Sequence, residues 1–195
     1  MNSHLSALRD LGVKDSKKLS PKKRTSLAHF LKKNCFSYRI EIVDVNEIDG
    51  RINQKISLNR LEELKMAKIL DELQPEEIYI DAADVNEKRF GNSIRKLLTF
   101  NPNVIISEHK ADEKYPIVSA ASIIAKYERD LIIEQLREKY GDFGSGYTSD
   151  SKTVEFLSNW IIEKKNIPPF ARRSWVTTKL LAEEHIYNRK LTEYF

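Results

Sequence analysis

The chain has 195 residues, of which 41% are hydrophobic and 32% are charged, and its net charge at pH 7 is +4. This composition is typical of a globular protein and excludes a disordered chain, and no apolar run approaches the roughly 20 residues that a membrane helix needs. The N-terminus has no secretory signal pattern, and the single cysteine, Cys35, excludes an intrachain disulfide and favours a reducing cytoplasm.

Strands that alternate with helices predict one α/β layered domain. The expected elements, in chain order, are helices at 3–11 and 21–33, a strand at 35–45, a helix at 57–73, a strand at 77–81, a helix at 85–98, a strand at 103–107, and helices at 115–140, 150–164 and 172–186. Ser20 and Pro21 are typical of an N-cap and a first helical position. Three glycines at 141, 144 and 146 predict a flexible loop.

Positive charge is concentrated in KDSKKLSPKKRTSLAHFLKK, residues 14–33, which carry eight Lys and Arg residues against the single acid Asp15. Such a block suits a phosphate backbone, because each neutralised phosphate releases a counterion. A solvated helix face is the alternative interpretation.

The stretch IYIDAADV, residues 78–85, ends a buried strand on Asp81. A carboxylate in that position is costly unless a positive group meets it, and the ends of strands in α/β folds are where ligands and ions bind. Asp84, by contrast, has the capping-box spacing to Glu87, which predicts a helix N-cap. Asp81 lies before the turn and has no such role.

Asp112 and Glu113 form a second acidic candidate, just before the long predicted helix. The helix dipole alone would favour negative charge there. If the two preceding strands run parallel, however, these acids reach the same sheet edge as Asp81. Two close carboxylates repel unless a hard cation such as Mg²⁺ or Mn²⁺ lies between them. The pattern therefore indicates metal-assisted phosphodiester chemistry.

Several stretches resemble, in their order, the archaeal form of ribonuclease HII, the type 2 ribonuclease H, and they cover nearly the whole chain: VKDSKKLSPKKR, IYIDAADV, EHKADEKYPIVSAASIIAK with YERD, YGDFGSGYTSD and IPPFARRSW. The resemblance implies a ribonuclease H-like fold, a mixed sheet flanked by helices with a C-terminal helical extension, over residues 1–182. It implies a monomeric endonuclease that hydrolyses the RNA strand of RNA–DNA hybrids and cuts at single ribonucleotides embedded in duplex DNA. A non-catalytic nucleic-acid-binding module is the alternative.

The resemblance also implies roles for individual residues. Asp81 and Asp112 match two members of a four-carboxylate site that binds Mg²⁺ or Mn²⁺. Tyr147 matches the residue that packs on the sugar next to the 2′-hydroxyl, the group that distinguishes RNA from DNA; a core position is its alternative. Further candidates for substrate contact, each with a surface or packing role as the alternative, are Lys17, Lys18, Lys110 and Ser119.

The family's other two carboxylates lie in an N-terminal strand with a G-I-D-E-A-G-R-G-type motif, which the printed chain does not contain. We therefore expect the first strand to be missing, an exposed sheet edge, and little or no cleavage by the 195-residue polypeptide alone. There are three explanations: an upstream start with Met1 as an internal methionine, a fragment, or a remnant that binds without cutting. We favour the first.

The tail NRKLTEYF, residues 188–195, places two aromatic residues three and four positions after a leucine. Exposed aromatic residues at a terminus are unusual without a partner. The spacing resembles a sliding-clamp-binding box, in which Leu191, Tyr194 and Phe195 would fill an apolar pocket, although Asn188 stands where the box normally has glutamine. The alternative is that the tail, counted from residue 183, continues the last helix on the protein's own surface.

Overall fold

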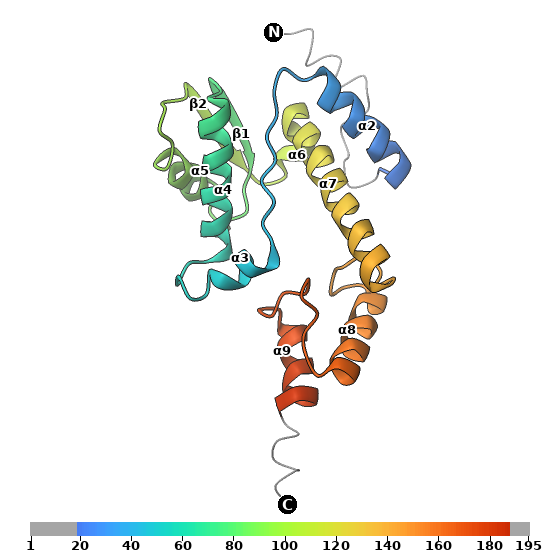
Figure 1. Ribbon diagram of the computed structural model, residues 1–195. Coiled ribbons are helices and arrows are strands. Elements are labelled where there is room, and N and C mark those ends of the chain that lie inside the picture. The colour runs from blue at the N-terminus through green and yellow to red at the C-terminus, as the bar shows by residue number, and fades with distance from the viewer. Residues whose placement is uncertain (1–18, 188–195) are drawn as a thin grey trace, which may run out of the picture. The chain divides into compact units, whose positions relative to one another are not determined.

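The computed structural model describes residues 19–187 (Figure 1). These residues divide into two compact units. The first unit contains residues 19–42 and 56–129, and the second contains residues 43–55 and 130–187. The predicted helix at 3–11 lies outside the described residues.

The first unit holds α2 (Pro21–Asn34), α4 (Leu58–Leu73), β1 (Glu77–Asp81), α5 (Glu87–Arg95), β2 (Val104–Glu108), α6 (Ala111–Lys114) and the start of α7 (Pro116–Tyr140). The second unit holds α3 (Val45–Gly50), the end of α7, α8 (Ser151–Lys164), α9 (Val176–Ala182) and the π-helix η1 (Glu183–Tyr187). The predicted α/β class is confirmed, and no helix within residues 19–187 is long and apolar enough to cross a membrane.

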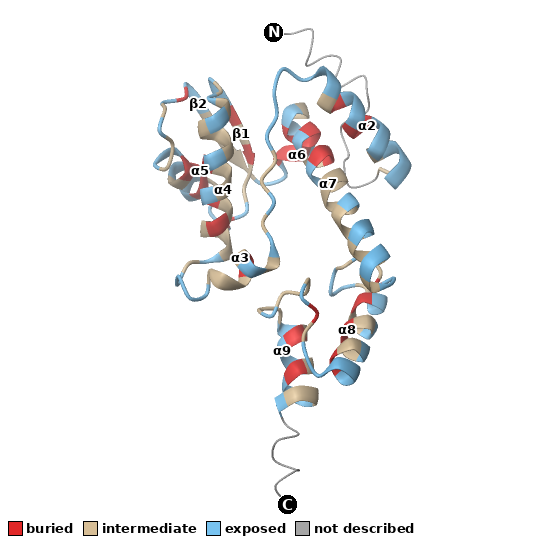
Figure 2. Ribbon diagram, in the orientation of Figure 1, coloured by how far each residue is buried: buried red, intermediate tan, exposed pale blue. Residues whose placement is uncertain are grey.

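The two strands β1 and β2 pair in parallel, in a register that runs from Glu77 opposite Val104 to Asp81 opposite Glu108. The condition under which Asp112 and Glu113 reach the sheet edge of Asp81, that the two strands run parallel, is therefore met. Ile78 and Ile80 point into a core that they share with Phe90 and Ile94 of α5, and side chains of α4 pack against it. Figure 2 shows these buried residues on β1 and α5. Both strands thus present their carboxyl ends at one edge.

Helix α5 lies unusually close to β2, because Gly91 faces the strand. A Cβ atom added at Gly91 would lie 2.8 Å from the Cβ of Ser107, closer than real Cβ contacts allow. The neighbouring residues Phe90 and Ile94 are completely buried. This contact fixes α5, and the segment that joins it to Asp81, firmly on the sheet.

We expect Gly91→Ala to destabilise the protein, although alanine is the better helix former. The helix-propensity gain is about 1 kcal/mol, whereas overpacking of a core costs about 1–3 kcal/mol, and the Cβ of Ser107 cannot rotate away. Denaturant unfolding would measure the change. Gly50→Ala is the matched control, since an added Cβ there meets nothing within 4 Å. Equal or greater stability of Gly91→Ala relative to Gly50→Ala would contradict the expectation.

The predicted strand at 35–45 is wrong. Residues 35–36 form a bend, residues 37–44 have no regular secondary structure, and no described strand pairs with them. The alternating polar and apolar side chains contact helices instead of a neighbouring strand. Arg39 Nε donates to Glu72 at 2.6 Å, and Lys68 Nζ lies 2.6 Å from Glu41. Ile40 packs against the core between α2 and α7. The short helix α3, which begins at Val45, was not predicted.

A second core joins α2 to α7. Leu27, Ala28 and Leu31 of α2 pack against Ala120, Ile123 and Ile124 of α7. Polar contacts flank this core, with His29 Nε2 2.8 Å from the Tyr127 hydroxyl and Lys32 Nζ donating to Glu128 at 2.6 Å. The long helix predicted from residue 115 begins at Pro116 and is preceded by the separate short helix α6.

The second unit is organised around aromatic side chains. Phe143 and Phe170 stack with ring centroids 5.0 Å apart, and Phe156 and Trp160 of α8 lie beside them. Asp49 joins α3 to this unit, because its carboxylate accepts the backbone N–H groups of Arg173 and Ser174 at 2.8 and 3.1 Å.

Candidate active site

Asp81 and Asp112 come together through the backbone at the carboxyl end of β1. The Asp81 Oδ1 atom accepts the N–H group of Ala111 at 3.3 Å, and Ala111 is the residue before Asp112. Asp81 is half-buried at the strand end, and Asp112 is buried in the first turn of α6. The parallel strands therefore bring the Asp81 carboxylate to the backbone of the residue that precedes Asp112.

Glu108, opposite Asp81 in the register, is a third carboxylate at this edge, but it is engaged elsewhere. Lys114 Nζ donates to it at 2.5 Å, and the Tyr115 hydroxyl donates at 3.3 Å. The Lys114 hydrogen bond holds the pKa of Glu108 below its usual value, and the same bond raises the pKa of Lys114. Glu108 thus stays ionised while its charge is balanced within the protein.

The pair of Asp81 and Asp112 fits a hard cation in its donor chemistry. Mg²⁺ typically takes one or two protein carboxylates and completes its shell with water and substrate phosphate oxygens. Within residues 19–187 no group of three or more His, Cys, Asp or Glu side chains is arranged to hold a metal ion. In the arrangement that the sequence predicts, Asp81 and Asp112 would hold the ion, with phosphate as a further source of ligands.

The predicted capping role of Asp84 is wrong. The N-cap of α5 is Asn86, whose side chain accepts the Arg89 N–H. Asp84 is buried, accepts the Asn86 N–H at 2.8 Å and binds the Arg89 guanidinium through both oxygens at 2.5 and 2.6 Å. The hydrogen bond from Arg89 is the main cause that lowers the pKa of Asp84. Asp84 is a structural residue that ties α5 to the end of β1.

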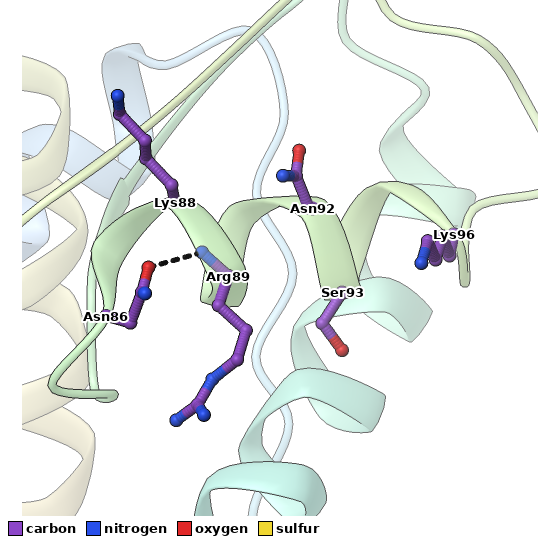
Figure 3. Close-up of a pocket in the computed structure, with 6 residues that line it drawn as sticks. All are labelled: Asn86, Lys88, Arg89, Asn92, Ser93 and Lys96. Carbon is purple, nitrogen blue, oxygen red and sulfur yellow. Dashed lines mark hydrogen bonds between the residues drawn. The ribbon is translucent and has the colours of Figure 1, made fainter.

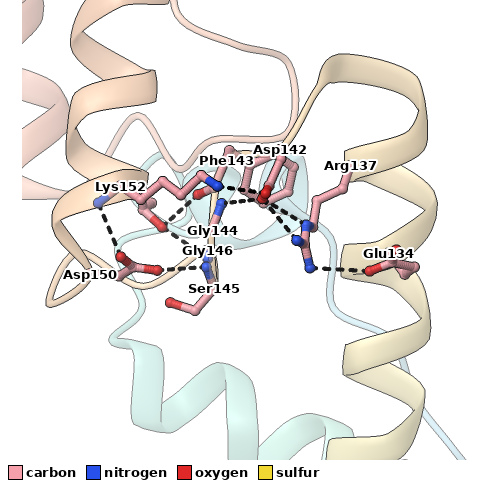
Figure 4. Close-up of polar contacts among 10 residues, drawn as sticks. Glu134, Arg137, Asp142, Phe143, Gly144, Ser145, Gly146, Asp150 and Lys152 are labelled. Carbon is pink, nitrogen blue, oxygen red and sulfur yellow. Dashed lines mark hydrogen bonds and ion pairs between the residues drawn. The ribbon is translucent and has the colours of Figure 1, made fainter.

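Tyr147 lies in the second unit on the glycine-containing loop, and 52% of its surface is exposed. A core position for Tyr147 is thereby excluded. Its loop is held by side chains at both ends (Figure 4). Asp150, the N-cap of α8, accepts the Ser145 N–H at 2.7 Å, and Thr153 accepts the Gly146 N–H at 3.1 Å. The loop therefore has a defined backbone conformation, contrary to the flexible loop that the glycines predict.

Asp142 is the charged centre of this loop, and the sequence reasoning missed it. Its carboxylate accepts Lys152 Nζ at 2.5 Å, the Gly144 N–H at 3.1 Å and Arg137 Nε at 3.0 Å (Figure 4). The Lys152 hydrogen bond is the largest of the causes that lower the pKa of Asp142 to about 2. An acid just before a glycine-rich turn was the signal available in the sequence.

The remaining predicted site residues fall into three places. Lys110 is exposed beside the carboxylates, with a left-handed φ of 55° that turns the chain from β2 into α6. Ser119 is completely buried in α7, which favours the packing role that its small neighbours indicate. Lys17 and Lys18 lie outside the described residues.

Similarity to solved structures defines the class of protein as one with a ribonuclease H-like fold. The crystal structure of the ribonuclease H2 from Pyrococcus horikoshii OT3 matches with a TM-score of 0.87 and 43% identity, over 95% of this chain and 87% of that one. The structure of the PCNA:RNase HII complex from Archaeoglobus fulgidus matches with a TM-score of 0.80 and 42% identity, over 92% and 84%. Bst-RNase HIII in complex with Mn²⁺ shares the fold at 20% identity, with a TM-score of 0.73 over 95% and 62%.

The chain belongs to the ribonuclease HII family. The family model for ribonuclease HII matches residues 2–178. Ribonuclease HII of Pyrococcus abyssi is 48% identical over 180 residues, which are 91% of this chain and 79% of the relative. Ribonuclease HII of Methanocella arvoryzae is 45% identical over 186 residues, or 95% and 82%. The resemblance found in the sequence motifs is thereby confirmed.

Proposed function

We propose that this protein is an endonuclease that hydrolyses the RNA strand of RNA–DNA hybrids and cuts at single ribonucleotides embedded in duplex DNA. Membership of the ribonuclease HII family is the observation that carries this proposal. The protein would work as a monomer in the cytoplasm, where its one cysteine, the exposed Cys35, stays reduced.

In this proposal Asp81 and Asp112 hold Mg²⁺ or Mn²⁺ against the scissile phosphate. A bound divalent ion supplies activation of the attacking water and neutralisation of the charge that develops on phosphate. The hydrogen bond from Ala111 orients Asp81 before substrate arrives, and Lys110 offers a phosphate contact beside the carboxylates. Tyr147, exposed on its fixed loop, supplies a flat surface for the sugar that carries the 2′-hydroxyl.

Cleavage of labelled duplexes tests the proposed function. We expect Mn²⁺- or Mg²⁺-dependent cutting of an RNA–DNA hybrid and of DNA with one ribonucleotide, no cutting of all-DNA duplex, and no activity in EDTA. If the protein binds hybrid tightly but does not cut it under any of these conditions, the non-catalytic binding module is the correct function.

We further propose that the tail 183–195 binds a sliding clamp and stands apart from a catalytic part at 1–182. The solved complex of RNase HII with PCNA from Archaeoglobus fulgidus supports a partner of this kind. Leu191, Tyr194 and Phe195, the predicted contacts, lie outside the described residues. An i, i+3, i+4 set of apolar anchors suits a helix that fills a groove.

Calorimetry of a peptide spanning 183–195 against the sliding clamp tests this partner. We expect saturable binding, and its loss when Tyr194→Ala is combined with Phe195→Ala, because the two rings supply most of the buried apolar area. A peptide with Thr192→Ala, which alters no anchor, is the control. Absence of binding at clamp concentrations of tens of micromolar would leave the tail as ordinary packing.

A further inference from the structure

A row of basic and amide side chains follows the outer face of α5 and is not explained by the site above. Lys88, Asn92 and Lys96 recur every four residues and are all exposed. With Asn86, Arg89 and Ser93 they line an open hollow of about 530 Å³ (Figure 3), and none of these six described lining residues is acidic. We refer to Lys88, Asn92 and Lys96 as the α5 stripe.

The charges of the α5 stripe are not neutralised within the described part of the chain. No described acid forms an ion pair with Lys88 or Lys96, in contrast to Lys32, Lys114 and Lys152, which are all paired. The acids nearest in the sequence are already engaged. Asp84 binds Arg89, and the Glu87 carboxylate accepts the His109 N–H at 2.5 Å. The stripe therefore presents net positive charge to solvent.

The inner face of α5 holds the stripe rigidly in the unit that carries Asp81 and Asp112. Gly91 allows contact with Ser107 of β2, and Phe90 and Ile94 fill the core beneath the helix. At the N-terminal end of α5, Arg89 binds Asp84, only three residues after Asp81. A ligand on the stripe would consequently be held in a fixed position relative to the carboxylates.

We propose that the α5 stripe binds the sugar–phosphate backbone of the substrate duplex away from the scissile bond. Lys88 and Lys96 are eight positions apart, about 12 Å along the helix, which corresponds to roughly three to four base-pair steps along the axis of a duplex. Lysine and asparagine are usual donors to phosphate oxygens, and such contacts position a duplex without reading its sequence. This inference rests on the proposed nuclease function and adds a second contact region to it.

Binding of a labelled RNA–DNA hybrid, measured without divalent ions across a range of salt concentrations, tests the assignment independently of catalysis. The double variant Lys88→Gln with Lys96→Gln should bind more weakly, and the slope of log K against log[salt] should be shallower by about 2, one for each lost phosphate contact.

The matched control is Lys164→Gln with Lys179→Gln, which removes the same charge from exposed positions of the second unit. Its salt slope should equal that of the wild type. An unchanged salt slope in the α5 variant, or an equal change in the control variant, would show that the α5 stripe does not bind the duplex. The nuclease function would still hold in that case, provided that the wild type binds and cleaves hybrid. If the α5 variant lost affinity only for single-stranded DNA and not for the hybrid, the assignment of the stripe to duplex binding would also be wrong. A wild type that binds no hybrid would overturn both proposals.

Discussion

Replacing Asp81 with asparagine should abolish cleavage of RNA–DNA hybrid while the affinity for the hybrid changes by only a few-fold. The carboxylate at the end of β1 has no capping role, and its one hydrogen bond within the described residues comes from Ala111, the residue before Asp112. Asparagine keeps the shape and one acceptor oxygen but removes the charge that a cation needs. We expect the rate to fall by about a hundredfold or more, which is the effect of losing a preorganised electrostatic contact to a transition state.

The measurement is single-turnover cleavage of hybrid by the Asp81→Asn variant and by the wild-type protein. Asp84→Ala is the control, because it removes a nearby carboxylate that binds Arg89 and not a candidate ligand. That variant should melt at a lower temperature, yet cleave at the wild-type rate while it is folded. An inactive Asp84 variant beside an active Asp81 variant would reverse the two roles.

Replacing Gly144 with alanine should destabilise the second unit and impair recognition of the ribonucleotide. Gly144 has a φ of +75°, and an added Cβ would lie 2.5 Å from Asp150 Oδ2 and 3.2 Å from the Cβ of Lys152. The left-handed backbone costs a residue with a Cβ about 1–2 kcal/mol, and the overpacking adds about 1–3 kcal/mol, for a total of about 2–5 kcal/mol. Asp150 would have to release the Ser145 N–H, so the loop that carries Tyr147 would shift.

Denaturant unfolding measures the stability, and kcat/KM for DNA with one ribonucleotide measures recognition. Gly141→Ala separates the effect of backbone strain from the effect of the contact with Asp150. Gly141 also has a positive φ, but its added Cβ would meet only Phe156, at 3.8 Å. We expect that variant to lose stability without the loss in kcat/KM. Equal losses in both variants would mean that backbone strain alone matters and that the contact with Asp150 does not position Tyr147.

The residues at the strand ends were predictable because the information is local. An apolar run that stops at Asp81, a second one that ends at Glu108, and the rule that parallel strands finish at one edge were enough to place Asp81 near Asp112. The bounds of α4 and α8 follow the predictions within one residue for the same reason, since Ser57 and Asp150 cap them with their own side chains.

The capping of α5 was not predictable, and an identical tetrapeptide explains why. Asp-Val-Asn-Glu occurs at 44–47 and again at 84–87. In the first copy Asp44 is the N-cap of α3 and accepts the Glu47 N–H at 2.9 Å, as the capping-box pattern indicates. In the second copy Arg89 binds the aspartate, and Asn86 becomes the cap. A charge two residues beyond the motif decides between the two outcomes.

The prediction of a strand at 35–45 was wrong for a different reason. Its alternation is genuine, but alternation reports only that opposite sides of an extended chain meet different surroundings. Here one side meets charged residues of α4 and the other meets the α2–α7 core. Which element provides those surroundings depends on residues far away in the sequence. Asp142 differs, because its partners Arg137 and Lys152 lie only five and ten positions away in the sequence.

The packing of α2 on α7 has a consequence for how the chain is made. Lys32 and its partner Glu128 are separated by 96 positions in the sequence. The apolar residues of α2 are separated from the apolar residues of α7 that they contact by similar intervals. At a synthesis rate of roughly 5–20 residues per second, the apolar face of α2 leaves the ribosome roughly 5–20 s before its partner does. During that interval Leu27 and Leu31 have no α7 to cover them. The lysines and arginine around them on α2 then act as charged gatekeepers that oppose aggregation of the nascent chain.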